Sequence, residues 1–422
     1  MSANPQVLIV GAGLAGLCCA KELQQGGVTF QLLEAADAVG GRVRTDTVEN
    51  FLLDRGFQVL LTAYPEACRA LDYERLSLRS FYPGALVRSG GRFHKLADPF
   101  RHPLESIASL FSPIGTLADK LRVAKLRRRV QGDALEDLFK RPETTTIEAL
   151  RAEEFSDSMI EKFFRPFFGG VFLESELRTS SRLFEFLFRM FSSGDTALPA
   201  DGMSAIPEQL ARTLPANSVR LQTQVARVEP RIVFLASGEK LSAEAIVIAT
   251  EEPAVAKLLG RPPYPASFHG VTTIYFAAER APLCEPILIL NGEGSGIINN
   301  VCVPSAVAPS YAPSGAALIA ISILDEQQQG DDNVLEETAR AELRSWFGQT
   351  VSAWRHLRTY RIRYALPEQT SLPFDGNNSP ARLQPGLYAC SDHLDTASIN
   401  GAMRSGRRAA EAIIKDFTQD QA

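Results

Sequence analysis

The stretch Val7-Leu8-Ile9-Val10-Gly11-Ala12-Gly13-Leu14-Ala15-Gly16 decides the fold of this chain. Its first four residues are apolar and mostly β-branched, which predicts a buried strand. The strand leads directly into the pattern Gly-x-Gly-x-x-Gly and an apolar helix. In this pattern Gly11 permits a tight turn, Gly13 lets a pyrophosphate approach the backbone, and Gly16 lets the helix pack closely on the strand. The free N–H groups at the start of that helix would face the phosphates.

A second strand and two charged residues extend this interpretation. Residues 28–33 are largely apolar and end at Glu34, whose spacing from the glycines suits a hydrogen bond to an adenosine ribose. An ordinary strand–turn–helix without a nucleotide is the alternative. Gly40-Gly41-Arg42 follows, and a second glycine pair before an arginine suits a cofactor longer than NAD, with Arg42 neutralising its pyrophosphate. The alternative for Arg42 is a solvated residue on a turn.

Residues 11–16, Glu34 and Gly40-Gly41-Arg42 together resemble the opening of the FAD-dependent amine oxidase, carotenoid (phytoene) desaturase and protoporphyrinogen oxidase superfamily. Residues 199–210 and 392–406 are similar to two further motifs of this group. The resemblance implies FAD, and the absence of the family's cysteine for covalent attachment implies noncovalent binding. Ser391 stands where the family usually has glycine, which leaves the pose of the ribityl chain open.

The resemblance predicts FAD contacts at both ends of the chain and in its middle. The expected contacts are Gly11, Gly13, Leu14, Ala15, Gly16, Glu34, Ala35, Gly41, Arg42, Gly56, Phe57, Val225, Thr250, Asp392, Ser398, Ile399, Asn400 and Ala402. By resemblance, Gly56 and Phe57 lie near the isoalloxazine ring, although a simple turn is the alternative. Val225 would meet the adenine, and Asp392 the ribityl chain or pyrophosphate. The helix that starts near Ile399 would stabilise negative charge on the reduced flavin.

The expected fold is α/β, with a Rossmann-type FAD-binding domain and an α+β substrate-binding domain made of a mixed sheet and a helical cap. The FAD-binding domain would be discontinuous, formed by residues 1–64, 199–256 and 378–422. The substrate-binding domain would take residues 65–198 and 257–377. A chain of 422 residues, 45% of them hydrophobic and 22% charged, is long enough for two domains with real cores.

Charge and cysteine content indicate the class of partner. A net charge of −5 gives no indication of nucleic-acid binding. The six cysteines have neither metal-ligand nor disulfide-framework spacing, so we expect no metal site and a reducing, cytoplasmic location. We find no signal peptide, and no apolar run reaches the ~18 residues of a membrane-spanning helix. The sequence does not indicate an oligomeric state.

Two segments indicate what the substrate-binding domain does. The chain has 24 Phe against nine Tyr and two Trp. Many of these Phe fall within residues 163–191 beside Gly169-Gly170, which predicts the wall of a large apolar cavity, although any single one can be core. Residues 103–130 combine an apolar stripe with many Lys and Arg, which suits peripheral contact with an anionic membrane. The alternative is a solvated helix whose basic end is favoured by the helix dipole.

The leading hypothesis is an FAD-dependent oxidoreductase that dehydrogenates or redox-isomerises a large apolar substrate, carotenoid-like or porphyrinogen-like, by hydride transfer to flavin N5. An amine or amino-acid oxidase is the second hypothesis. It needs an aromatic cage, for which Tyr360, Tyr364 and Phe374 are substitutes at best, and Arg361 and Arg363 could bind a carboxylate. The third hypothesis is a non-catalytic protein that binds flavin and lipid. No catalytic residue can be named, and His393 is more typical of a structural or surface histidine.

Overall fold

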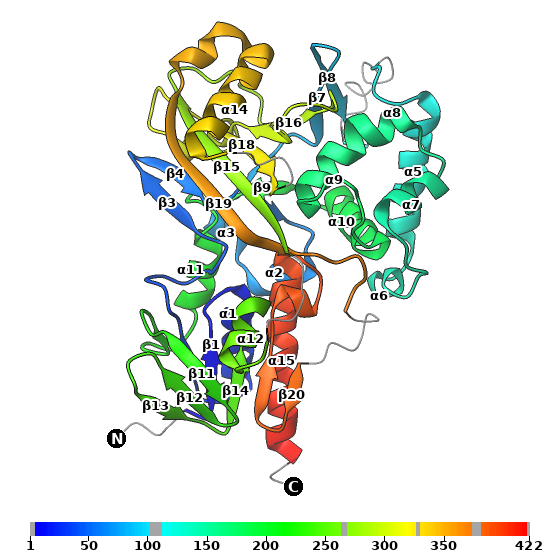
Figure 1. Ribbon diagram of the computed structural model, residues 1–422. Coiled ribbons are helices and arrows are strands. Elements are labelled where there is room, and N and C mark those ends of the chain that lie inside the picture. Colours follow the sequence, from blue (N-terminus) through cyan, green and yellow to red (C-terminus); the bar gives the residue numbers. More distant parts are fainter. Residues whose placement is uncertain are drawn as a thin grey trace.

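The computed structural model describes residues 5–98, 100–101, 112–262, 268–325, 330–373 and 381–419. Two large sheets organise them (Figure 1). The strand order of the first sheet is β10 (Val219–Arg220), β2 (Phe30–Leu33), β1 (Val7–Val10), β14 (Ala245–Ile248), β21 (Leu387–Ala389) and β20 (Arg382–Gln384). The strand order of the second is β19 (Arg355–Pro367), β15 (Phe268–Ala278), β18 (Ala317–Leu324), β17 (Asn300–Cys302), β16 (Leu288–Asn291), β7 (Gly84–Ser89) and β8 (Arg92–Ala97).

The first sheet is parallel except at its β20 edge, and its centre is fully buried. β1 pairs in parallel with β2 on one side and with β14 on the other. Every residue of β1 and β14 is buried, as expected for parallel strands covered on both faces. The strand predicted over residues 28–33 is shorter in the structure, where β2 begins at Phe30.

Two helices from opposite ends of the chain pack together beside this sheet. α1 (Leu14–Gln25) contacts α15 (Ile399–Gln419), and both lie next to β1 in Figure 1. A Cβ atom on Gly406 of α15 would lie only 2.0 Å from the carbonyl oxygen of Ala15, so glycine is needed for this close approach. This part of the fold therefore joins residues almost four hundred positions apart.

The second sheet is mixed and carries its own core. β7 and β16 are parallel, whereas β15 is antiparallel to both β18 and β19. α14 (Asp332–Phe347) buries Leu335, Ala339, Leu343 and Trp346 in a hydrophobic cluster with the β15 and β18 side chains. β19 is an edge strand of this sheet.

A helical block flanks the second sheet, at the right of Figure 1. It contains α5 (Leu117–Gly132), α6 (Leu135–Leu138), α7 (Thr146–Ala152), α8 (Asp157–Met159), the π-helical turn η1 (Ile160–Phe164), α9 (Arg165–Phe172) and α10 (Ser181–Ser193). Thr116 starts α5 with a capping box, in which its hydroxyl and the Asp119 carboxylate each accept the other residue's backbone N–H. Among the described residues, no helix is long and apolar enough to cross a membrane.

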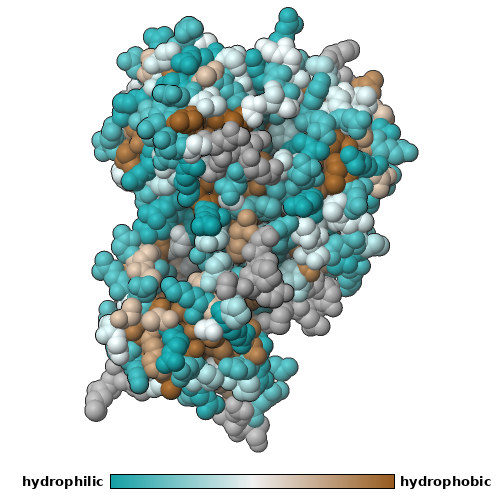
Figure 2. Space-filling model, in the orientation of Figure 1, coloured by the Kyte–Doolittle hydropathy of each residue, from teal (hydrophilic) through white to brown (hydrophobic). Residues whose placement is uncertain are grey.

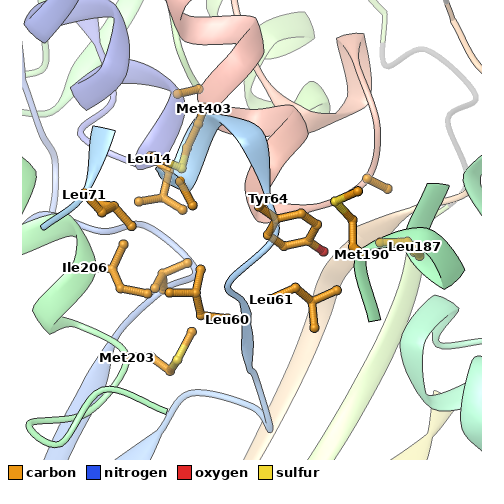
Figure 3. Packing of buried hydrophobic residues seen from close by; sticks show 14 of the residues in the cluster. Leu14, Leu60, Leu61, Tyr64, Leu71, Leu187, Met190, Met203, Ile206 and Met403 are labelled. Carbon is orange, nitrogen blue, oxygen red and sulfur yellow. The ribbon is translucent and has the colours of Figure 1, made fainter. Parts of the chain in front are cut away.

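Short elements connect these units. They are β3 (Thr45–Val48), β4 (Phe51–Asp54), β5 (Leu60–Leu61), α2 (Pro65–Ala70), α3 (Tyr73–Leu76), β6 (Arg79–Ser80), β9 (Thr196–Leu198), α11 (Ala205–Arg212), β11 (Val225–Glu229), β12 (Ile232–Leu235), β13 (Lys240–Ser242), α12 (Glu252–Leu258), α13 (Pro304–Val307), η2 (Pro309–Tyr311), η4 (Gly348–Ala353) and η5 (Asp392–Leu394). Figure 3 shows Leu14 and Met403 on one side of Tyr64, and Met190 and Leu187 of α10 on the other. One continuous core therefore connects the first sheet with the helical block.

The observed sheets relate simply to the expected domain division. Every strand of the first sheet comes from the segments 1–64, 199–256 and 378–422, and every strand of the second from 65–198 and 257–377. The division itself stays our prediction. Part of the segment 103–130 lies outside the described residues, and helix α5 begins at Leu117 within its described part.

Candidate functional site

A cavity of about 1500 Å³ runs from the carboxyl ends of the first sheet to the helical block. Of the eighteen expected FAD contacts, sixteen line it: Gly11, Gly13, Leu14, Ala15, Glu34, Ala35, Gly41, Arg42, Gly56, Phe57, Val225, Thr250, Asp392, Ser398, Ile399 and Ala402. These residues come from all three segments of the predicted nucleotide domain. The fold thus brings residues distant in sequence to one place.

The other two expected contacts lie outside the lining. A Cβ atom on Gly16 would meet the carbonyl oxygen of Gly11 at 2.0 Å, so Gly16 serves the close packing of α1 on the turn below it. Asn400 is buried, and its Oδ1 accepts a hydrogen bond from the backbone N–H of Glu66 at 3.0 Å. That bond joins α15 to α2 and uses the Asn400 side chain for structure.

One end of the cavity has the geometry of an anion site. Gly11 has φ of +107° and lies so close to the carbonyl of Ala249 that a Cβ would be 2.7 Å from its oxygen. A Cβ on Gly13 would meet no atom within 4 Å and would project into free space. No side chain caps α1 at Gly13, and its first turn contains no acidic residue. The positive end of the helix dipole is therefore left available to an anionic group such as a pyrophosphate.

Two polar side chains are fixed at the same end. The Glu34 carboxylate accepts hydrogen bonds from the N–H of Ala12 at 2.7 Å and of Ala36 at 2.8 Å, which hold it at the end of β2. The Thr250 hydroxyl is buried and has no hydrogen-bond partner among the residues that the structure describes. A buried polar atom without a partner is rare in proteins. A dinucleotide supplies ribose hydroxyls that a carboxylate can bind and oxygen atoms that a threonine hydroxyl can bind, so the residues present fit FAD.

An ion pair closes the middle of the cavity. Nη2 of Arg42 lies 2.6 Å from Oδ1 of Asp392, and Nη1 donates to the carbonyl oxygen of Ala365 at 2.8 Å. Burial alone would raise the pKa of Asp392, but the charge and hydrogen bond of Arg42 bring that pKa below its ordinary value. His393 does not line the cavity; burial lowers its pKa, and the Asp392 charge opposes this.

The far end of the cavity is apolar and aromatic. It is lined by Phe163, Phe167, Phe168, Phe188 and Phe191, which we call the Phe chamber. The ring centroids of Phe167 and Phe191 are 5.1 Å apart in an edge-to-face arrangement. The remaining aromatic residues of the segment 163–191, Phe164, Phe172, Phe184 and Phe186, are fully buried core. The prediction of an apolar cavity wall thus holds for part of the Phe-rich segment, whereas the other part fills the core.

The opening of the Phe chamber lies along α5. Phe100, Leu117 and Leu121 line the opening and are 55%, 61% and 73% exposed. Lys120 and Arg127 lie among them, and the Arg127 guanidinium stacks 4.2 Å from the Phe100 ring centroid. Figure 2 shows apolar residues at the surface on the side where Figure 1 has the helical block. Residues 103–111 of the segment expected to touch a membrane lie outside the described residues.

A second, open groove of about 530 Å³ lies along β19. Tyr360, Tyr364, Arg361 and Arg363 line it, and none of them lines the cavity that contains the Phe chamber. The two tyrosines named as substitutes for an amine cage therefore face this groove. Phe374, the third, lies outside the described residues.

Tyr64, Asn300 and Glu251 are among the residues that line the cavity without having been expected from the sequence. Tyr64 is buried against Phe186, with ring centroids 6.1 Å apart, and no described residue forms a hydrogen bond with its hydroxyl. Asn300 donates to Ser322 Oγ at 3.3 Å on the wall of the Phe chamber. Glu251 follows β14 at the boundary of both cavities, and burial raises its pKa against the influence of Arg42. Only Glu251 had a sequence signal, as an acidic residue directly after a buried strand.

Comparison with known proteins assigns the family. The model of the family described as flavin containing amine oxidoreductase matches residues 14–414. The chain belongs to this family. The family's description names flavin as the cofactor, and the α/β fold is the one expected from the glycine motif.

Individual relatives are distant. Protoporphyrinogen oxidase 2 of Arabidopsis thaliana is 24% identical over 171 residues, which cover 39% of this chain and 32% of that protein. Coproporphyrinogen III oxidase of Mycobacterium tuberculosis is 24% identical over 284 residues, which cover 60% of each chain. The chain thus spans less than two thirds of either relative. The crystal structure of an oxidoreductase from Methanosarcina mazei has a TM-score of 0.73 at 17% identity, covering 96% of this chain and 99% of that one, and so shares the fold.

Proposed function

We propose that this protein oxidises a large apolar substrate, porphyrinogen-like or carotenoid-like, which enters the Phe chamber. The observation that carries this proposal is the single cavity that joins the nucleotide end to five Phe side chains. Its volume of about 1500 Å³ exceeds the roughly 300–1,000 Å³ of an ordinary ligand pocket, so it can take FAD and a bulky substrate together. Two relatives named as porphyrinogen oxidases support the porphyrinogen-like branch.

The residues that would hold FAD follow from the geometry of the nucleotide end. The uncapped start of α1 and Arg42 would bind the pyrophosphate, Glu34 the ribose, and Val225 the adenine. Gly56 and Phe57 would lie at the isoalloxazine ring, and Ser398 and Ile399, at the start of α15, at its pyrimidine end. Bound FAD supplies the hydride acceptor, flavin N5. The Phe chamber would exclude water and hold the substrate against the flavin.

The substrate can be tested by anaerobic titration. Reduced flavin loses its yellow absorption, so a substrate is recognised by bleaching of the oxidised holoenzyme. We expect bleaching by detergent-solubilised porphyrinogens or carotenes and none by amines or amino acids. Phe188→Ala, which enlarges the chamber, should raise the substrate concentration for half-bleaching about tenfold, since a partly buried Phe that the substrate covers contributes up to roughly 1.5–3 kcal/mol. Phe347→Ala is the control, because Phe347 packs on the second sheet away from the cavity.

The alternatives give different outcomes in the same titration. Bleaching by an amine or amino acid alone would contradict the proposal and favour amine oxidation, the activity in the family's description. Binding of apolar ligands without any bleaching would favour the non-catalytic hypothesis. Equal effects of the Phe188 and Phe347 substitutions would show that the chamber does not hold the substrate.

We also propose that the α5 opening touches an anionic membrane, from which an apolar substrate would load. The support is the group of exposed apolar residues Phe100, Leu117 and Leu121 beside Lys120 and Arg127 at the opening of the chamber. Such a combination is typical of helices that lie in a bilayer interface.

Vesicle flotation tests this contact. Wild-type protein is expected to float with vesicles of phosphatidylcholine and phosphatidylglycerol and less with phosphatidylcholine alone. The double variant Leu117→Ser and Leu121→Ser should bind at least about tenfold more weakly, because two leucines no longer enter the interface. Val334→Ser is the control, since Val334 is similarly exposed but lies on α14. Equal binding by all three proteins would contradict the contact.

A further inference from the structure

The groove along β19 is rich in arginine and lies beside the cofactor cavity. Its lining contains five arginines, Arg42, Arg55, Arg358, Arg361 and Arg363, against the carboxylates of Asp46 and Glu251. It shares Arg42, Arg55, Glu251 and Ile362 with the cofactor cavity, but none of the Phe chamber residues. Figure 1 places β3 and β19 on the opposite side of the molecule from α5 and α10. The groove is therefore an approach to the cofactor separate from the substrate opening.

Asp46 holds the guanidinium groups of the groove in place. Its Oδ1 and Oδ2 accept hydrogen bonds from Nε of Arg55 at 3.3 and 3.1 Å, and Nη2 of Arg55 donates to Oδ1 at 2.9 Å. The Tyr360 hydroxyl donates to Asp46 Oδ2 at 2.7 Å, and Arg358 Nη1 lies 3.6 Å from the same oxygen. This network fixes the rotamers of two arginines and a tyrosine before any ligand arrives. Preorganised donors lose less side-chain entropy on binding.

The groove retains an excess of positive charge, although most of its arginines are paired: Arg42 with Asp392, Arg55 and Arg358 with Asp46, and Arg361 with Asp332 at 2.6 Å. Among the described residues Arg363 forms no ion pair; its guanidinium lies 5.7 Å from the Tyr364 ring centroid. Arg358 is half-exposed and lies at the outer end of the Asp46 network. A cluster of guanidinium groups in one hollow matches the planar oxygens of carboxylates and phosphates, which arginine binds in a bidentate manner.

Protection of a sheet edge is the simpler explanation for charges on β19, because charged residues on an edge strand prevent pairing with other chains. Arg355 serves that role equally well. It lies on the same strand but outside the groove, and its Nη1 pairs with Glu49 at 2.8 Å. Edge protection does not account for the hollow, for the tyrosine walls or for the shared boundary with the cofactor cavity. Arg355 therefore separates the two explanations in an experiment.

We propose that the β19 groove is a second binding site, which takes a small molecule bearing carboxylate or phosphate groups, independently of the substrate in the Phe chamber. The bound anion would lie beside Arg42, whose other side faces Asp392 in the cofactor cavity. Ile362 would connect it to the flavin-facing turn, because its Cδ1 lies 2.9 Å from the position of a Cβ on Gly56. Occupancy of the groove should therefore change the electrostatic environment of the flavin.

The test uses the FAD-loaded protein without substrate. Citrate and inorganic pyrophosphate are titrated separately at constant ionic strength set with sodium chloride, and the flavin difference spectrum is recorded. We expect a saturable change with at least one of the two anions, which identifies carboxylate or phosphate as the preferred group. The double variant Arg358→Gln and Arg363→Gln should raise the dissociation constant at least about tenfold, as expected for the loss of charge-assisted hydrogen bonds. Arg355→Gln should change it less than about twofold.

Several results would overturn the proposal. These are a spectral change that does not saturate with either anion, one that sodium chloride reproduces, and equal weakening by Arg355→Gln. Retained affinity in the double variant would also do so. The single variant Arg363→Gln gives a second reading if the double variant loses FAD, because Arg363 forms no ion pair with any other described residue. The anion titration does not depend on which substrate bleaches the flavin. The β19 groove proposal can therefore be contradicted while the proposed function holds, and the reverse.

Discussion

Replacing Arg42 with glutamine is expected to weaken FAD binding by about a hundredfold or more and to lower stability. The substitution removes the guanidinium that we assign to the pyrophosphate and leaves the carboxylate of Asp392 buried without its charged partner. Breaking a buried ion pair in this way costs about 3–5 kcal/mol of stability. The loss of affinity comes from the charge-assisted hydrogen bonds to the pyrophosphate, and about 1.4 kcal/mol corresponds to a tenfold change. The measurements are the flavin content after purification, the FAD dissociation constant and the Tm.

Two further variants separate the effect on the cofactor from the effect on the fold. Arg44→Gln is the control, because Arg44 pairs with the largely exposed Asp37 and a surface pair contributes little. Asp392→Asn combined with Arg42→Gln removes the unpaired charge, so the Tm should partly recover while FAD binding stays weak. Full FAD affinity in Arg42→Gln would contradict the role that we assign to Arg42.

Asp54→Asn is expected to become more stable relative to wild type as the pH rises. The difference in the free energy of unfolding between variant and wild type should be about 3 kcal/mol larger above pH 6 than below pH 4. Asp54 is buried, and burial raises its pKa to about 6. Hydrogen bonds from Thr45, from the backbone N–H of Met203 and from Tyr311 oppose that shift. In the unfolded chain the pKa of aspartate is about 3.9.

The direction of this effect follows from proton linkage. Between pH 4 and 6 the folded state keeps a proton on Asp54 that the unfolded state has released, so the free energy of unfolding decreases as the pH rises through this range. A shift of two pKa units corresponds to about 3 kcal/mol. Asparagine does not titrate, and it can accept from Thr45 and Met203 while donating to Tyr311. Urea unfolding of both proteins from pH 4 to 8 measures the difference.

Asp46→Asn is the matched control and should have the opposite sign. Burial raises the pKa of Asp46, but hydrogen bonds from Arg55 and Tyr360 outweigh burial and lower it overall. Its contribution to stability is therefore present above the unfolded pKa and is lost as the pH falls. Parallel pH profiles of Asp54→Asn and wild type would show that Asp54 does not titrate between pH 4 and 6.

The parts of the fold that could be predicted are those written in short contiguous motifs. The Gly11–Gly16 turn, Glu34 and the segment around Asp392 each have a local backbone requirement, and family resemblance placed them around one cofactor. The structure gathers them along one cavity. Asn400 could not be predicted in detail, because its partner is the N–H of Glu66, 334 residues away in sequence.

The chamber and the groove were harder to predict because burial depends on tertiary packing. Phe164 and Phe167 have similar sequence surroundings, yet Phe164 is fully buried core and Phe167 lines the cavity. Phe164 ends the π-helical turn η1, whereas Phe167 lies in the α-helix α9 that follows it, and a π-helical turn shifts the helical phase. Likewise, the alternating charges of β19 gave no indication that Asp46, from a different strand, draws Arg55, Arg358 and Tyr360 together.

The contact of α1 with α15 has a consequence for protein synthesis. α1 leaves the ribosome early, but α15, which packs on it through Gly406, is made after every other described element. The strand β14, which completes the partner positions of β1, also follows more than two hundred residues later. Early in translation β1 therefore has no β14 beside it and exposes an apolar edge. Nascent chains with such exposed edges depend on chaperones. Residues around Asp392 and Ile399 also line the cofactor cavity, so this cavity is complete only after the chain has closed around its own first helix.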